Sequence, residues 1–357
     1  MILESAFIVR LLYTLLLAAG ISCALTPLVK WLAKKVGAMD IPKDKRRMHQ
    51  KPIPRMGGLG IFLGFLTSFL IFGEMEPQIR GILIGAVIIV ILGIVDDIKA
   101  LKALPKFFTQ IVAAIIVVVH GCRIEHVLGW ELPLWLSYGA TVIWIVCLTN
   151  AVNFIDGLDG LAAGVSAISA GSMLVVALLL VPDPNAKISA LILAAILGGC
   201  IGFIPYNFNP ASIFMGDTGS TFLGFMLASV SVFGLFKTYT MISFAVPFLV
   251  LGLPLFDICF AVIRRLLKGQ SPMHADRGHV HHRLIDMGFS QRQAVMISYL
   301  ITVILGICAV VLTDKGEIQA LIFFAALVLV GTVGLQLFFI KSHHKRHEEE
   351  NNDDKED

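Results

Sequence analysis

Four polar residues at steps of three form the stretch of this sequence with the clearest capacity for chemistry. Asn150, Asn153, Asp156 and Asp159 lie between two long apolar runs, and each aspartate is followed by a glycine. Glycine at these positions favours a helix end or a turn over a continuous helix. The pattern predicts a polar platform at a membrane boundary that holds two carboxylates close together. The alternative is a short loop whose aspartates only cap helices.

A second acidic group, Asp96 and Asp97, closes an apolar run and is followed by three lysines, of which Lys106 is the last. Adjacent carboxylates repel each other, so a nearby cation is needed to keep both of them ionised. Such a pair at a membrane boundary suits metal binding or proton abstraction. Plain charges at a helix end are the alternative.

A third acidic position, Asp217, lies between Gly216 and the pair Thr218-Gly219. It belongs to the polar stretch 206–220, which contains no Lys or Arg. At the entry to the next apolar run this carboxylate is either an N-cap or a group that holds a hard cation against a phosphate. Phe214, three residues earlier, is either a packing residue or a face on which a base stacks.

A histidine cluster, His279, His281 and His282, is followed directly by Arg283. A zinc site would need a further Cys or His pair at suitable spacing, and the sequence offers none. Histidine and arginine together suit the oxygens of a diphosphate, and histidine also transfers protons. The cluster therefore predicts a phosphate-binding segment.

Asp257 is a carboxylate inside an apolar run. An intramembrane acid is a candidate functional group, but it could also simply pair with Arg264 or Arg265, about two turns further along.

The loop 40–58 is basic. Lys51 and Arg55 enclose two prolines and precede a Gly-Gly pair, and a rigid basic turn at the start of a helix suits a phosphate. The other basic residues of the loop could act only as topology determinants that bind anionic lipid headgroups.

The composition shows which elements must position these groups. Of 357 residues, 57% are hydrophobic and 15% are charged, and the mean hydropathy is +0.85. A soluble domain carries about 25% charged residues. We therefore predict an all-α polytopic membrane protein, with one integral-membrane domain at 1–340 and a charged, disordered cytoplasmic tail at 341–357. The six scattered cysteines suggest no metal or disulfide framework.

Eleven apolar segments are long enough to be candidate membrane helices, of which the third and fourth are short and could be tilted or re-entrant. They are 7–29, 56–73, 81–95, 104–121, 134–152, 161–181, 186–204, 220–236, 241–263, 293–312 and 318–340. If all eleven cross, 22 Lys and Arg lie on one side and six on the other. The positive-inside rule then puts the N-terminus outside, the C-terminus in the cytoplasm and every polar stretch above on the cytoplasmic face.

Five motifs in this order resemble those of the polyprenyl-phosphate N-acetylhexosamine-1-phosphate transferases, the glycosyltransferase family 4 type. They are PRMGG (54–58), DD (96–97), NAVNFIDGLDGL (150–161), FNPASIFMGDTGS (208–220) and HVHHR (279–283). The resemblance implies a bacterial plasma-membrane enzyme that uses magnesium, with manganese as a substitute, undecaprenyl phosphate as acceptor and a UDP-amino sugar as donor. It implies the lipid bilayer but no nucleic acid as a partner, and leaves a homodimer open.

The resemblance also implies roles for single residues. Asp217 would bind magnesium, Asp96 or Asp97 would act on the lipid phosphate, and the catalytic candidates His281 and His282 would approach the diphosphate or the lipid phosphate. The resemblance assigns substrate contacts to Lys106, Asn153, Asp156, Asp159, Asn207 and Phe214. Residue type and position add Lys51, Arg55, His279 and Arg283 to the candidate substrate-binding residues. Direct attack by the lipid phosphate and a covalent aspartyl-phosphate route both remain open.

The His-x-His-His-Arg form resembles the N-acetylglucosamine branch of the family, because Val280 interrupts the run of three histidines typical of the muramyl-pentapeptide branch. We therefore expect transfer of N-acetylglucosamine 1-phosphate from UDP-N-acetylglucosamine, starting a teichoic acid or related surface polymer. The peptidoglycan translocase is the alternative within the family. A transporter of anionic metabolites would need polar residues at mid-span and an inverted repeat, and the sequence shows neither. A scaffold that recruits other enzymes would leave Asp217 and the paired acids unexplained.

Overall fold

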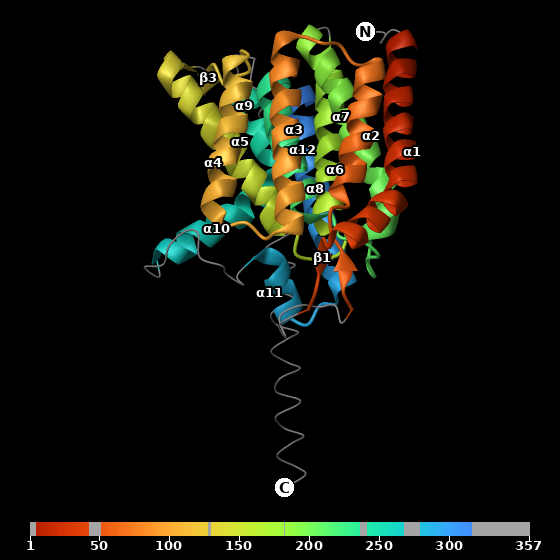
Figure 1. The fold of residues 1–357 in the computed structure, drawn as a ribbon. Coiled ribbons are helices and arrows are strands. Elements are labelled where there is room, and N and C mark those ends of the chain that lie inside the picture. The colour runs from red at the N-terminus through yellow and green to blue at the C-terminus, as the bar shows by residue number, and fades with distance from the viewer. Residues whose placement is uncertain are drawn as a thin grey trace.

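A computed structural model shows a bundle of upright helices with the short elements gathered at its two ends (Figure 1). The structure describes residues 5–42, 51–127, 130–181, 183–235, 241–267 and 279–315. Segment 318–340, the tail 341–357 and parts of the loops 40–55 and 264–292 lie outside these residues.

The bundle is built from helices, with two short antiparallel hairpins of two-residue strands. The helices are α1 Ser5–Val36, α2 Gly58–Phe72, α3 Pro77–Ile98, α4 Ala103–Val119, α5 Leu134–Ile155, α6 Leu161–Leu179, α7 Pro184–Asn207, α8 Gly216–Val230, α9 Met241–Val250, α10 Gly252–Leu267, α11 Val280–Asp286 and α12 Gln291–Lys315. A π-helical turn, Ser231–Leu235, follows α8. The strands are β1 Met39–Asp40 with β2 Ile53–Pro54, and β3 His126–Val127 with β4 Trp130–Glu131.

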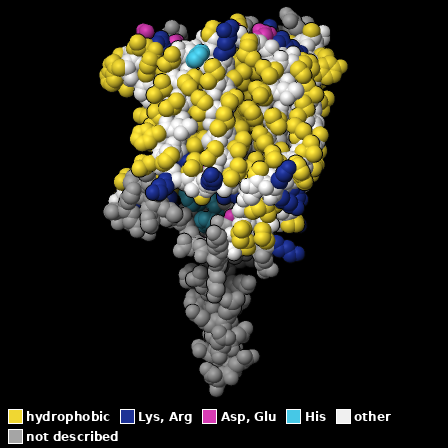
Figure 2. All heavy atoms as spheres, in the orientation of Figure 1, with side chains coloured by type: hydrophobic (Ala, Val, Ile, Leu, Met, Phe, Trp, Pro, Cys, Tyr) yellow, Lys and Arg dark blue, Asp and Glu magenta, His cyan; other side chains and the backbone are white. Residues whose placement is uncertain are grey.

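The length and surface of the helices identify a polytopic membrane protein. Within the described residues, six helices (α1, α3, α5, α6, α7 and α12) are long and apolar enough to cross a membrane, and α2 and α4 are shorter apolar helices. Figure 2 shows hydrophobic side chains covering the middle of the bundle, with Lys and Arg near its two ends. The predicted polytopic, helical class is thus confirmed. The third and fourth segments form upright helices of 22 and 17 residues.

Helix α8 forms the centre of the bundle, and it approaches its neighbours closely because glycines lie at the crossings. A side chain on Gly93 of α3 would collide with the backbone of Thr218, and one on Gly58 of α2 with the backbone of Gly219. On the α5 side, Gly224 packs against the backbone of Leu148. Small residues allow such backbone approach in membrane bundles. The close packing holds the N-terminus of α8 among the ends of α2, α3 and α5.

The segment 241–263 was expected to be a single helix, and this expectation is wrong. It consists of α9 and α10, separated at Leu251. Pro254 has no N–H to donate to the carbonyl of Val250, so the helical ladder is interrupted at this point. Helix α10 runs obliquely across the lower end of the bundle (Figure 1).

The polar stretches predicted from the sequence lie at the lower end in Figure 1, with α10, α11 and the β1–β2 hairpin. Helix α5 ends at Ile155 and α6 begins at Leu161. Asn150 and Asn153 therefore lie in the last turns of α5, whereas Asp156 and Asp159 lie in the turn that the glycines predicted. Gly160 occupies the left-handed region in this turn, with φ +82°, which favours glycine.

Candidate active site

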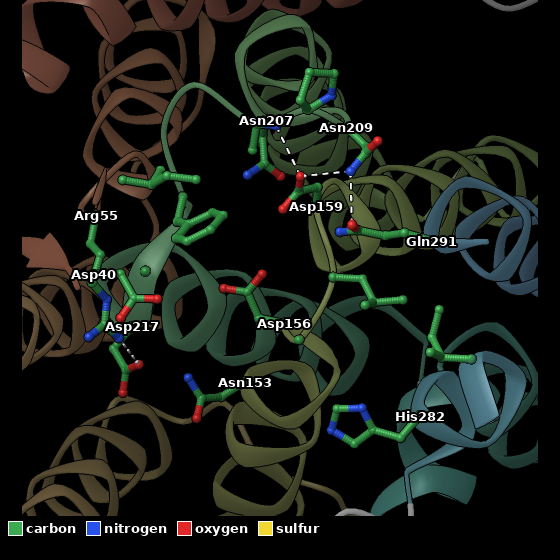
Figure 3. A pocket seen from close by; sticks show the side chains of 18 of the residues that line it. Asp40, Arg55, Asn153, Asp156, Asp159, Asn207, Asn209, Asp217, His282 and Gln291 are labelled. Atoms are coloured by element: carbon green, nitrogen blue, oxygen red, sulfur yellow. Dashed lines mark hydrogen bonds and ion pairs between the residues drawn. The ribbon is translucent and has the colours of Figure 1, made fainter. Parts of the chain in front are cut away.

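A cavity of about 750 Å³ opens at this end of the bundle. Eight residues predicted from the sequence line it: Arg55, Asn153, Asp156, Asp159, Asn207, Phe214, Asp217 and His282. They come from the β1–β2 region, the α5–α6 turn, the end of α7, the start of α8 and α11, and they surround one space (Figure 3). The fold thus brings together five segments that are far apart in the sequence.

The cavity is strongly acidic. Among the described residues that line it, Asp40, Asp156, Asp159, Asp217 and Asp286 are carboxylates, whereas Arg55 is the single Lys or Arg side chain. Burial and the neighbouring Asp217 carboxylate together raise the pKa of Asp156 to about 8, because the ionised form loses hydration and is repelled. A polyanionic ligand could enter such a cavity only with added positive charge.

Asp217 is the centre of a charged cluster. The ammonium group of Lys106 lies 2.6 Å from Asp217 Oδ2 and 3.2 Å from Asp96 Oδ2, so this lysine bridges the two carboxylates. Arg55 Nη2 lies 3.7 Å from the other Asp217 oxygen. Asp96 also accepts a hydrogen bond from the backbone N–H of Leu101 at 2.7 Å. The cluster places two cations against the carboxylates on one side of the cavity.

Asp97 is buried and fully engaged by the start of α8. Its Oδ1 accepts from the N–H of Asp217 at 3.0 Å, and its Oδ2 accepts from the N–H and the hydroxyl of Thr218 at 3.1 and 2.7 Å. Arg55 Nε lies 3.4 Å from Oδ1. The approach depends on Gly216, whose φ is +72° and where any side chain would collide with the Asp97 carboxylate. Asp97 therefore fixes the backbone that carries Asp217.

Two residues predicted to bind the nucleotide build the wall with their side chains. Asn207 accepts from the N–H of Gly160 at 3.1 Å and donates to the carbonyl of Ile213 at 3.0 Å, which uses both ends of its amide. Asp159 Oδ2 accepts from Asn209 Nδ2 and from the N–H of Ala211, both at 3.0 Å. These bonds tie the α5–α6 turn to the loop after α7.

Other platform residues divide between the cavity and the bundle. Asn153 lines the cavity and donates to the hydroxyl of Ser220 at 2.8 Å. Asn150 is not among the lining residues, because it donates to Gln110 on α4 at 2.6 Å. Phe214 is held at the cavity by backbone bonds to Pro54 and Gly57, at 2.8 and 2.9 Å. Phe214 is thus one of the residues that line the cavity.

The histidine cluster is split between the cavity and the structure behind it. His282 lines the cavity, whereas His279 and His281 are buried. The ring of His281 packs so closely on Gly157 that a side chain there would collide with it. His279 Nδ1 lies 2.7 Å from Asp257 Oδ2. Asp257 also accepts from the N–H of Val280 at 2.7 Å, so its hydrogen bonds go to the start of α11.

Four predicted substrate ligands are not among the residues that line the cavity: Lys106 and His279, whose contacts are given above, and Lys51 and Arg283. Lys51 and Arg283 are both exposed, and neither is among the residues that line the cavity. Their contacts with a substrate stay predictions.

Sequence reasoning missed several residues of the cavity. Asn209 lies in the polar stretch 206–220, and Asp40 is the first residue of the basic loop 40–58. Their place in these two polar stretches is the signal that could have identified them. Gln291 and Asp286 carried no motif. Gln291 Oε1 accepts from Asn209 Nδ2 at 2.9 Å, a contact between residues 82 positions apart (Figure 3).

The described residues contain no group of three or more His, Cys, Asp or Glu side chains arranged as a complete metal site. The oxygens of Asp217, Asp156 and Asn153 nevertheless lie on the same cavity. Mg²⁺ is commonly held by one or two carboxylates together with water and substrate phosphates, so this donor set fits such an ion.

Comparisons with known proteins identify the family of this chain. The family model "Glycosyl transferase family 4" matches residues 79–235. The chain is 43% identical over 317 residues to the "Probable undecaprenyl-phosphate N-acetylglucosaminyl 1-phosphate transferase" of Bacillus subtilis, covering 86% of this chain and 84% of that protein. The chain belongs to glycosyl transferase family 4.

Other members of glycosyl transferase family 4 align over most of the chain. The "Decaprenyl-phosphate N-acetylglucosaminephosphotransferase" of Mycobacterium tuberculosis is 34% identical over 319 residues, covering 80% of this chain and 78% of that protein. The "Undecaprenyl-phosphate alpha-N-acetylglucosaminyl 1-phosphate transferase" of Escherichia coli is 30% identical over 284 residues, covering 77% and 76%. The family resemblance found in the motifs is thereby confirmed.

The bonding of the two adjacent acids predicts different effects on stability. Asp97→Asn places an amide N–H₂ against N–H donors of α8, whereas Asp96→Asn can keep the bond from Leu101. We expect Asp97→Asn to lower the stability by about 1–3 kcal/mol more than Asp96→Asn. Thermal unfolding of the two purified variants beside wild type measures this difference. Equal midpoints would show that Asp97 does not hold α8.

Proposed function

We propose that this protein transfers N-acetylglucosamine 1-phosphate from UDP-N-acetylglucosamine to undecaprenyl phosphate, giving undecaprenyl-diphospho-N-acetylglucosamine and UMP. The observation that supports this most directly is the position of Asp217. Its carboxylate contacts the cations Arg55 and Lys106, and it lines the same cavity as the carboxylates Asp156 and Asp159. The names of the relatives in Bacillus subtilis and Escherichia coli specify the sugar and the lipid of those proteins.

A divalent cation is part of the proposal, because carboxylates outnumber cations among the described residues that line the cavity. Asp217 would hold Mg²⁺ or Mn²⁺, with oxygens of Asp156 and Asn153 on the same cavity. When bound, the ion would neutralise charge on the diphosphate and on the departing UMP. Asp156 has a raised pKa of about 8, and a cation beside it would favour its ionised form.

The chain's own cations would hold the phosphates. In the proposed reaction an oxygen of the lipid phosphate attacks the phosphorus that bears the sugar, a new P–O bond forms, and the P–O bond to UMP breaks. Arg55 and Lys106 lie beside Asp217, where they would offset the charge of two polyanionic substrates. Phe214 would offer its ring to the uracil, and His282 would donate to the diphosphate from the opposite wall.

The two adjacent acids receive different roles in this proposal. All hydrogen bonds of Asp97 serve the start of α8, which makes it a positioning residue. Asp96 shares Lys106 with Asp217, so Asp96 is the acid that would face the lipid phosphate and keep it ionised. Direct attack on phosphorus needs no aspartyl-phosphate intermediate, and we favour it because the buried Asp97 has no unused oxygen.

We also propose the orientation expected from the sequence, with eleven membrane segments, the N-terminus outside and the C-terminus in the cytoplasm of a bacterial cell. Of the described Lys and Arg residues, more lie at the cavity end than at the opposite end, and UDP-sugars are cytoplasmic nucleotides. At that end lie Lys30, Lys34, Lys35, Arg55, Lys99, Lys102, Lys106, Arg264 and Arg265, whereas Arg10, Arg80, Arg123 and Lys187 lie at the other. The lipid product would start a teichoic acid or related surface polymer.

Labelling of single cysteines tests this orientation. In a background without the native cysteines, Met287→Cys lies between α11 and α12 at the cavity end, and Glu131→Cys lies on the hairpin at the other end. In intact cells we expect Met287→Cys to react only with a membrane-permeant maleimide and Glu131→Cys to react with an impermeant one. Reaction of Met287→Cys with the impermeant reagent would overturn the orientation.

Asp217→Asn tests the metal role. Because Asp217 would contribute charge rather than packing, the variant should stay folded but lose at least about 100-fold in turnover at saturating Mg²⁺. Turnover is measured as UMP release after chelation and stepwise return of Mg²⁺. Asp286→Asn removes a carboxylate from the same cavity outside the proposed metal site, and it should cost much less. A near-normal rate for Asp217→Asn would remove Asp217 from the metal role.

The donor tests the function itself. Purified protein should exchange labelled UMP with UDP-N-acetylglucosamine only when polyprenyl phosphate and Mg²⁺ are both present. UDP-N-acetylmuramyl-pentapeptide should react up to about 10⁴-fold more slowly, since its groups would clash or stay unpaired. His282→Ala should slow the exchange strongly. Efficient use of the pentapeptide donor would move this protein to the peptidoglycan branch.

A further inference from the structure

Asp257 links α10 to the start of α11. It is 2% exposed, and its Oδ2 lies 2.7 Å from His279 Nδ1. Its Oδ1 accepts from the backbone N–H of Val280, also at 2.7 Å. Both oxygens of one buried carboxylate therefore hold the residue before α11 and the first residue of that helix.

The contact continues from His279 to the cavity through a series of neighbouring imidazole rings. The imidazoles of His279 and His281 are nearly parallel, at 4° and 5.7 Å between centroids. His281 lies 4.2 Å from the ring of His282, which lines the cavity, and it is pressed against Gly157 of the α5–α6 turn. A shift of His279 would therefore move the ring that faces the proposed diphosphate.

We propose that Asp257 is a positioning residue for the transferase reaction, which sets the place and the protonation of the histidine cluster through His279. This inference rests on the proposed function. Asp257 does not line the cavity, so it acts through another residue and not on the substrate.

The chemistry of the pair follows from which atoms can donate. An ionised carboxylate only accepts hydrogen bonds, so the proton between the two groups is on Nδ1 of His279. In the neutral ring this leaves the lone pair on Nε2. A carboxylate that orients an imidazole in this way fixes its tautomer and the direction of the ring.

Asp257→Asn separates this role from a purely structural one. The asparagine oxygen can still accept from Val280 N–H, and its amide N–H₂ can donate to Nδ1 if His279 takes the other tautomer. The position of α11 is then largely kept, but the charge and the tautomer are changed. Asp257→Ala removes both bonds and reports the structural contribution.

UMP release from UDP-N-acetylglucosamine, with saturating polyprenyl phosphate and Mg²⁺, is the measurement. We expect Asp257→Asn to lower kcat by about 10- to 100-fold. The KM for the donor should stay within about twofold of wild type, because the lost interaction belongs to the transition state. The matched control is Asp183→Asn, which changes an aspartate that caps α7 at the far end through the N–H of Asn185 at 2.8 Å. Asp183→Asn should keep wild-type kcat.

A double-mutant cycle shows whether the effect passes through His279. In a His279→Gln background, adding Asp257→Asn should lower kcat by less than about twofold. Independent, multiplying effects would overturn the proposal, and so would a kcat for Asp257→Asn within twofold of wild type. Inactivity of the wild-type protein towards this donor would count against the proposed function instead. If Asp257→Ala does not fold, the Asn variant and the cycle still decide.

Discussion

Mutual repulsion of carboxylates is the constraint on which the cavity end of this structure depends. Asp96, Asp97, Asp156 and Asp217 lie near one another, and three of them share only two cations, Arg55 and Lys106, among the described residues. The fold compensates for this with fixed donors. Asp97 accepts from two backbone N–H groups and a hydroxyl at the start of α8, so the end of α3 and the start of α8 are tied together. That tie fixes the position of Asp217.

The same constraint shapes what the cavity can bind. Arg55 and Lys106 are engaged by carboxylates, so their charge is already partly neutralised before any phosphate arrives. A phosphorylated ligand must therefore compete for these cations or bring positive charge with it. A divalent ion resolves the competition, because it adds two charges and shares oxygens with the ligand. In the proposed reaction, nucleotide binding and metal binding would for this reason support each other.

Local signals in the sequence predicted local structure well. The glycines after Asp156 and Asp159 indicated the turn between α5 and α6, and Asp217 was expected at a helix entry, where it lies. Pro254 was a local signal for the break between α9 and α10, but the continuous apolar run 241–263 predicted a single helix. Membrane character followed from composition alone, because a chain with so few charges cannot cover its surface with polar groups.

Contacts between distant segments could not be predicted in this way. The pairing of Asp257 with His279 spans 22 positions, and that of Asn209 with Gln291 spans 82. Each depends on how helices pack, which no spacing within one segment records. Asn207 is a further example. Its motif predicted a ligand contact, but nothing in the motif indicated that its amide would hydrogen-bond to the backbone of Gly160 and Ile213.

The cavity wall therefore has two parts that are held differently. One part, at the ends of α3, α5, α7 and α8, is joined by several bonds to backbone groups and by helix crossings at glycine. The other part, α11 with the start of α12, is held through Asp257 and through Asn209, which bonds to Gln291 and Arg292. A change in any of these bonds would act first on α11 and the start of α12, whereas the Asp217 cluster is held by separate contacts. The structure thus separates the charged centre, which the proposed phosphoryl transfer needs with any donor, from the wall that carries His282.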